Sequence, residues 1–228
     1  MKTVSKLFVL ACCLAGLRAS AQLNTYTDLA SWQAAVNPGS ITSVNFEGIV
    51  GTPSDPNYGL GLNNFTYYSS PPGLTIGDAN FQYTSPTPGL LFLLGDDYYY
   101  SGQPAELSAQ DFGADPPPGD PDGITVTFAH PITAFDMTFE SFFGTPFTFT
   151  AGGGSYTQTA PTTGAGLGFV GITSDTPFTS FTVTTPAEFA MSFASLSYGS
   201  VPDVFSTAWT LCLGLAGCGM FRRLRGSR

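Results

Sequence analysis

The sequence predicts an all-β fold, an antiparallel sandwich with one short helix near its start. Apolar and polar residues alternate with a period of two in most segments after residue 41, which is typical of strands with one buried face. The 27 glycines and 18 prolines separate these segments, at roughly the spacing that turns have in a sandwich. The 20 phenylalanines supply large apolar side chains for the core.

The first 21 residues are typical of a secretory signal peptide. Two lysines precede an apolar segment, residues 7–17, that is too short to span a bilayer. Ala19 and Ala21 supply the small residues of a cleavage site, so we expect the mature chain to begin at Gln22. The alternative, a lipoprotein signal that ends at Cys12, would leave an apolar core of only about five residues.

One helix is expected over residues 24–37. Leu29 and Trp32 recur at helical spacing and should pack on a sheet edge. Thr27 or Asp28 can cap the helix start, and an Asn-Pro-Gly sequence ends it.

The strands are expected in short runs after this helix. The clearest alternation lies at residues 124–128, 135–140, 147–150, 181–184 and 189–194. Shorter candidates are 44–47, 65–68, 74–76, 81–83, 90–94, 155–159 and 169–172, and the three glycines at 152–154 predict a hairpin.

Charge and cysteine are segregated along the chain. All seven basic residues lie within residues 2–18 and 222–228, whereas all 16 acidic residues lie between Gln22 and Asp203. A segment without Lys or Arg cannot neutralise phosphates, which excludes nucleic-acid binding, and its partners should be neutral or cationic. The four cysteines also lie outside this segment, so it holds no disulfide and no cysteine nucleophile.

No enzymatic activity is expected. His130 is the one histidine of the chain, and with Pro131 it predicts a turn between two strands. No Gly-x-Ser-x-Gly sequence is present, and the acidic residues include no evident catalytic pair.

Two segments are candidates for ligand binding. An Asp-rich loop suits a hard cation such as calcium, with solvated turn residues as the alternative reading; its residues are Asp111, Asp115, Asp120 and Asp122. A run of aromatic residues can stack on sugar rings, with an exposed strand edge as the alternative; it comprises Tyr98, Tyr99 and Tyr100. No cofactor other than this calcium is expected.

The C-terminal segment, residues 201–228, has three parts. Val201-Pro202-Asp203 is followed by a mostly apolar stretch, residues 204–221, and then by a basic cluster that begins with Arg222 and Arg223. As a helix, the apolar stretch would be about 27 Å long and would barely span a bilayer. Arginines on its far side should stay in the cytoplasm. Pro202 disfavours helix at Val201, which should leave an extended, exposed segment for a protease. A plain membrane anchor is the alternative.

This three-part segment resembles the PEP-CTERM class of sorting signals in its Val-Pro-Asp variant. The resemblance implies an exosortase as the partner that recognises and processes the chain. The variant usually continues Ser-Gly, whereas Val204 and Phe205 stand here. The segments 44–48 and 196–199 also resemble the opening and closing strands of other proteins with such signals, which implies a jelly-roll-like sandwich.

The expected organisation is therefore a signal peptide (1–21), a β-sandwich ectodomain (22–200) and a sorting signal (201–228). The chain should be exported, held in the inner membrane as a precursor, and then placed at the cell surface or in the extracellular matrix. Its expected role is structural or adhesive, in the exopolysaccharide layer. A carbohydrate-binding module, alone or assisted by calcium, is the alternative, and a glycan-active hydrolase is a remote one.

Overall fold

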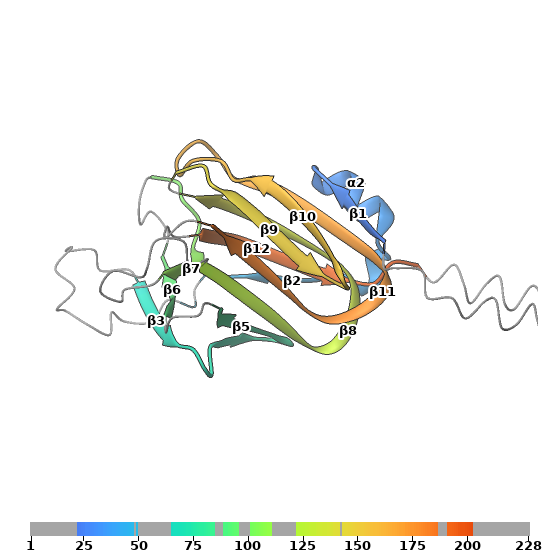
Figure 1. Cartoon of the computed structure of the whole chain (residues 1–228), viewed down its shortest axis with the longest axis horizontal. Helices are drawn as coiled ribbons and strands as arrows, with labels where there is room; N and C mark the ends of the chain where they lie inside the picture. Colours follow the sequence, from blue (N-terminus) through green and yellow to red (C-terminus); the bar gives the residue numbers. More distant parts are fainter. Residues whose placement is uncertain are drawn as a thin grey trace, which may run out of the picture.

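The computed structural model describes residues 22–47, 49, 65–84, 89–95, 101–110, 122–141, 143–186 and 191–202. Within these ranges the chain is an antiparallel all-β structure with one short α-helix (Figure 1). Its elements are β1 (Leu23–Tyr26), α2 (Leu29–Ala35), the 3-10 turn η1 (Pro38–Ser40), β2 (Thr42–Asn45), β3 (Phe65–Ser69), β4 (Leu74–Ile76), β5 (Ala79–Tyr83), β6 (Leu90–Leu94), β7 (Glu106–Gln110), β8 (Asp122–Ser141), β9 (Pro146–Ala151), β10 (Gly154–Thr159), β11 (Gly168–Thr185) and β12 (Met191–Gly199). The described part contains no helix long and apolar enough to cross a membrane.

The strands follow the order β10-β9-β11-β8-β12-β7-β6-β3, and β1, β2, β4 and β5 pair with members of this series. The long strand β8 is at the centre, because it pairs with β11, β12 and β5. This arrangement confirms the predicted antiparallel fold.

The turn predicted at His130 and Pro131 is wrong, because both residues lie inside the 20-residue strand β8. The pairing with β11 continues on both sides of them, with Ile132 opposite Phe178 and Thr127 opposite Ser180. Register shifts in this region take up the extra residues and bend the pair. Pro131 is tolerated at such an irregularity because no ladder hydrogen bond is required there. Figure 1 shows both long strands curving as they run through the molecule.

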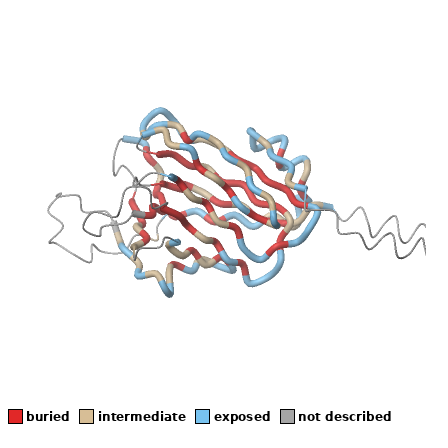
Figure 2. The backbone as a smooth tube through the Cα atoms, viewed as in Figure 1, coloured by how far each residue is buried: buried red, intermediate tan, exposed pale blue. Residues whose placement is uncertain are grey.

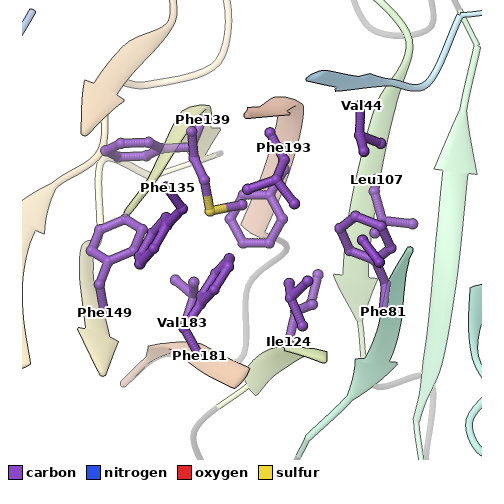
Figure 3. Close-up of a cluster of buried hydrophobic side chains, with 14 of the residues drawn as sticks. Val44, Phe81, Leu107, Ile124, Phe135, Phe139, Phe149, Phe181, Val183 and Phe193 are labelled. Carbon is purple, nitrogen blue, oxygen red and sulfur yellow. The ribbon is translucent and has the colours of Figure 1, made fainter. Parts of the chain in front are cut away.

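Phenylalanine side chains from several strands form the core, as the sequence predicted. Phe135 stacks on Phe181 at 4.0 Å between ring centroids, and Phe139 meets the edge of Phe149 at 5.5 Å. Figure 3 shows these rings and Phe193 pointing toward one another between the strands. Each buried ring contributes about 1.5–3 kcal/mol by transfer estimates, which replaces the stabilisation that disulfides supply in disulfide-linked domains. Buried residues follow the strands, and exposed residues lie at the bends (Figure 2).

The helix is shorter than predicted. Asp28 caps α2 by accepting a hydrogen bond of 2.8 Å from the Ser31 amide, as one of the two predicted caps should. Residues 24–26, expected in the helix, instead belong to β1, which pairs with β11. Trp32 is fully buried as predicted, but Leu29 is 46% exposed, contrary to prediction. A seven-residue helix makes only about two turns. Trp32, the one buried residue of this helix, packs against β11 and donates a hydrogen bond to it.

Candidate functional site

A groove lies where the first and the last segments of the described chain come together. Its walls come from β1, the end of α2, the middle of β8, the middle of β11 and the segment that follows β12. The volume is about 930 Å³. The groove is lined by Asn24, Tyr26, Ala35, Asn37, Pro131, Thr133, Thr173, Ser174, Asp175, Pro177, Ser200, Val201 and Pro202. No sequence pattern indicates this groove, because it combines short, widely separated pieces of the chain.

The lining of this groove is mostly neutral. Asp175 is the one charged side chain among the lining residues, and its Oδ1 accepts a hydrogen bond of 3.0 Å from the Gln22 amide. The Tyr26 hydroxyl lies 3.5 Å from the Thr173 hydroxyl. Asn24 and Asn37 add amide side chains. Apolar walls with scattered neutral hydrogen-bonding groups suit an uncharged polar ligand better than an anion.

The same groove contains the start of the predicted processing tripeptide. The Val201 amide donates a hydrogen bond of 2.8 Å to the Thr133 hydroxyl, and Val201 packs partly buried against the cluster of Trp32, Val36 and Ala134. Just before it, the Ser200 amide donates to the Ser40 hydroxyl at 2.9 Å. Pro202 is exposed as predicted, but the expectation of an exposed Val201 is wrong, because the domain binds this residue through both its backbone and its side chain.

Most of the other predicted site residues lie outside the described residues. These are Ala19, Ala21, Tyr98, Tyr99, Tyr100, Asp111, Asp115, Asp120, Asp203, Arg222 and Arg223. From the Asp-rich loop, only Asp122 is described; it is buried at the start of β8, where its Oδ1 accepts a hydrogen bond of 2.6 Å from the Tyr83 hydroxyl. Among the described residues, no group of three or more His, Cys, Asp or Glu side chains is placed to hold a metal ion.

Buried carboxyl groups form a second feature that the sequence reading missed. Glu106 and Glu140 are both 0% exposed. Burial, and then the nearby charge of Glu140, raise the pKa of Glu106 to about 8, although hydrogen bonds from Gln103 and Ser192 act in the opposite direction. Burial likewise raises the pKa of Asp136 to about 6, opposed by hydrogen bonds from Ser197. Nothing in the local sequence distinguishes these residues from surface carboxylates.

The described fold and groove define this chain as a small antiparallel β domain. No family model matches it, and no curated protein is similar enough to count as a relative. Among solved structures, it is similar to a mutant of a family 29 carbohydrate-binding module, with 12% sequence identity and a TM-score of 0.33, over 61% of this chain and 95% of that one. A similarity this low does not establish a shared function.

Proposed function

We propose that this chain is an exported bacterial surface protein, sorted through residues 201–228 by an exosortase, with a structural or adhesive role in the exopolysaccharide layer. The observation that carries the proposal is the three-part pattern of that segment, which follows directly on the last described strand, β12. The jelly-roll winding implied by the same resemblance is part of this proposal.

The chemistry of the domain is compatible with a place outside the cell. Its phenylalanine core buries a large apolar area, so the domain can be stable there without a disulfide. Threonine hydroxyls pair across its polar faces, as between Thr125 and Thr182 at 2.9 Å and between Thr148 and Thr157 at 2.9 Å. Such uncharged faces, kept soluble by acidic side chains, suit contact with neutral polymers.

The test is the intact mass of the protein recovered from the surface of an exosortase-bearing host. We expect a mature chain that begins at Gln22 and lacks residues 222–228. A double variant, Arg222→Ala with Arg223→Ala, should accumulate unprocessed or misplaced. The matched control, Arg222→Lys with Arg223→Lys, keeps the positive charge, so its C-terminus should stay on the cytoplasmic side of the membrane. A mature wild-type chain that retains residues 222–228 would contradict the proposal and leave a plain membrane anchor.

A second function, the binding of a neutral carbohydrate, is favoured by the groove. Its amide and hydroxyl groups beside the Tyr26 ring match what a sugar offers, which is hydroxyl groups and an apolar ring face. A glycan array should identify a ligand. Asn24→Ala and Tyr26→Ala should weaken its binding, whereas Tyr67→Ala, a half-exposed tyrosine on β3 outside the groove, should not. The absence of any ligand on the array would reject this function.

A further inference from the structure

Strand β10 is an edge strand of the sheet, because its one partner among the described strands is β9. The two strands form a hairpin with a two-residue turn, in which Ala151 is opposite Gly154 and the register continues without a bulge. In such a hairpin the pair that flanks the turn is hydrogen-bonded, and hydrogen-bonded pairs then alternate along the strands. The Ala160 amide, which donates to the Thr145 carbonyl at 2.9 Å, fits this alternation. Every second residue from Gly154 onward therefore directs its backbone groups toward β9.

The other residues of β10 direct their backbone N–H and C=O groups away from β9. These residues are Ser155, Thr157 and Thr159. Within the described part of the chain, no hydrogen bond involves these outward backbone groups. Natural edge strands are usually protected against pairing by lysine, proline, a bulge or a very short strand. β10 has six residues, all uncharged, with no proline and no bulge, so neither its sequence nor its register prevents pairing with another strand.

The edge is also free of charge. No charged residue occurs in residues 143–174, which include β9, β10 and the start of β11, whereas the rest of residues 22–203 holds all 16 acidic residues of the chain and no Lys or Arg. Two copies of so acidic a domain repel each other, and the repulsion is screened only over about 8 Å at physiological ionic strength. A charge-free edge lets two backbones meet without bringing carboxylates together. A basic partner would bind the acidic remainder instead, so this edge fits a second copy of the chain.

We propose that two copies of this chain associate through β10, whose outer edge pairs antiparallel with that of the second copy across a two-fold axis at Thr157. One register brings all the outward groups into hydrogen-bonded pairs: Thr157 lies opposite Thr157 of the second copy, and Ser155 lies opposite Thr159 on either side. Each hydrogen-bonded pair exchanges two hydrogen bonds, so the edge forms about six. The pairing is a case of strand addition, in which main-chain hydrogen bonds supply the affinity.

The two ends of β10 favour this antiparallel orientation. At its hairpin end, a Cβ on Gly152 would lie 3.0 Å from Ser174 Oγ, so the exposed carboxylate of Asp175 is nearby. At its other end, where the loops after β8 and β10 meet, Phe143 and Leu167 are 63% and 39% exposed. The two-fold axis puts the acidic end of one copy beside the apolar end of the other. Parallel pairing would instead bring the two Asp175 carboxylates together.

The side chains of β10 fit the same register. On the inner face, Tyr156 of each copy lies opposite Gln158 of the other, in a pair of the kind that brings side chains closest. Tyr156 is half-buried and packs against the hydrophobic core, so a second copy covers the part of its ring that the core leaves exposed. On the outer face, Thr184, Thr148 and Thr157 form a row across three strands, which continues through the axis into the second copy.

The first test is residue-resolved hydrogen exchange on the purified full chain, in a mild detergent that shields its apolar end segments. Sedimentation gives the dimer Kd. Where about nine tenths of the chains are paired, the amides of Ser155, Thr157 and Thr159 should exchange about tenfold more slowly than in the dilute monomer. The Tyr156 and Gln158 amides, bonded to β9, are the internal control and should be protected at both concentrations. Exchange of the three outward amides that does not depend on concentration would overturn the proposal, and so would protection that appears instead on β3, the opposite end strand of the series.

Thr157→Asp is the second test, because it sets two carboxylates opposite each other at the axis and should weaken association about tenfold or more. Thr127→Asp is the matched control: it adds the same charge to an exposed threonine of the same sheet face, on β8, which already pairs on both sides. It should associate as the wild type does. A folded Thr157→Asp chain that pairs with unchanged Kd, or a wild type that stays monomeric at about 1 mM, would contradict the proposal. None of these results depends on sorting by an exosortase or on sugar binding in the groove.

Discussion

The backbone amide of Gln22 donates a hydrogen bond of 3.0 Å to the carboxylate of Asp175. This contact continues the pairing of β1 with β11, in which Leu23 is opposite Ser174. If the signal peptide is removed before Gln22, the amide becomes an α-ammonium group and the hydrogen bond becomes an ion pair. The domain would then gain a positive charge beside a carboxylate in a segment that has no Lys or Arg.

Asp175→Asn should therefore destabilise the mature chain slightly. Exposed ion pairs contribute about 0–1 kcal/mol, so we expect the melting temperature to fall by at most about 2–4 °C, and by less at high salt. A chain that retains Ala21 keeps the amide without the charge and serves as the control. An equal loss in both chains would show that the ion pair contributes nothing.

Gly171 lies directly beneath Trp32. A Cβ at this glycine would lie 2.6 Å from Trp32 Cδ1 and 2.8 Å from Trp32 Cβ. Because Trp32 is fully buried and its ring cannot move outward without losing contacts, Gly171→Ala should cost about 1–3 kcal/mol of unfolding free energy. Urea unfolding measures this loss.

Gly39→Ala is the matched control for that substitution. A Cβ there would be 3.6 Å from its nearest neighbour, the Asn37 side chain, which is ordinary contact. We expect a change within about 0.5 kcal/mol. Equal effects of the two substitutions would mean that the contact between Trp32 and Gly171 is not tight.

Some elements of this structure could be predicted from the sequence, and others could not. The alternation of Phe147 and Phe149 with threonines predicted β9, and the adjacent glycines predicted its hairpin with β10, where Gly152 and Gly153 have φ of +54° and +86°. Such features depend on near neighbours in the chain. The continuity of β8 through Pro131 depends instead on β11, whose pairing overrides a local turn signal.

The buried carboxyl groups and the groove were less predictable from the sequence, because they too depend on contacts between distant parts of the chain. Glu106 is in an ordinary apolar-polar alternation, so the sequence marks it as a surface residue, whereas its burial comes from tertiary packing. The groove joins Asn24, Thr133 and Asp175, which no periodicity relates. The proposed sorting pattern of residues 201–228 is different, because its three parts are contiguous in the sequence.

The raised pKa values of Glu106 and Asp136 make the stability of the domain depend on pH. The folded state favours the protonated form, with a pKa of about 8 for Glu106 against 4.5 ordinarily, and about 6 for Asp136 against 3.8. Between each ordinary value and the raised one, the folded chain binds more protons than the unfolded chain. Stability should therefore fall as pH rises through these windows, by at most about 1.4 kcal/mol per pH unit for each proton.

Urea midpoints measured between pH 4 and 9 should show this decline, which should level off only about one unit above the raised pKa of Glu106, about 8. Glu106→Gln should flatten the upper part of the curve, and Asp136→Asn should flatten the lower part. A stability that rises with pH between 6 and 8, or a Glu106→Gln curve parallel to that of the wild type, would contradict the assigned groups.

The hydrogen bond from the Val201 amide to Thr133 makes the start of the proposed processing segment part of the folded domain. Thr133→Val keeps the shape of the side chain and removes the acceptor, which should cost about 1 kcal/mol of local stability. Hydrogen exchange at the Val201 amide should then become roughly fivefold faster. Thr127→Val, at an exposed position on the same strand, is the control and should leave that exchange unchanged. If an exosortase must take an extended tripeptide into its site, the Thr133→Val chain should also be processed faster in the host. Unaltered exchange at Val201 would mean that packing against Trp32, rather than this hydrogen bond, holds the segment in place.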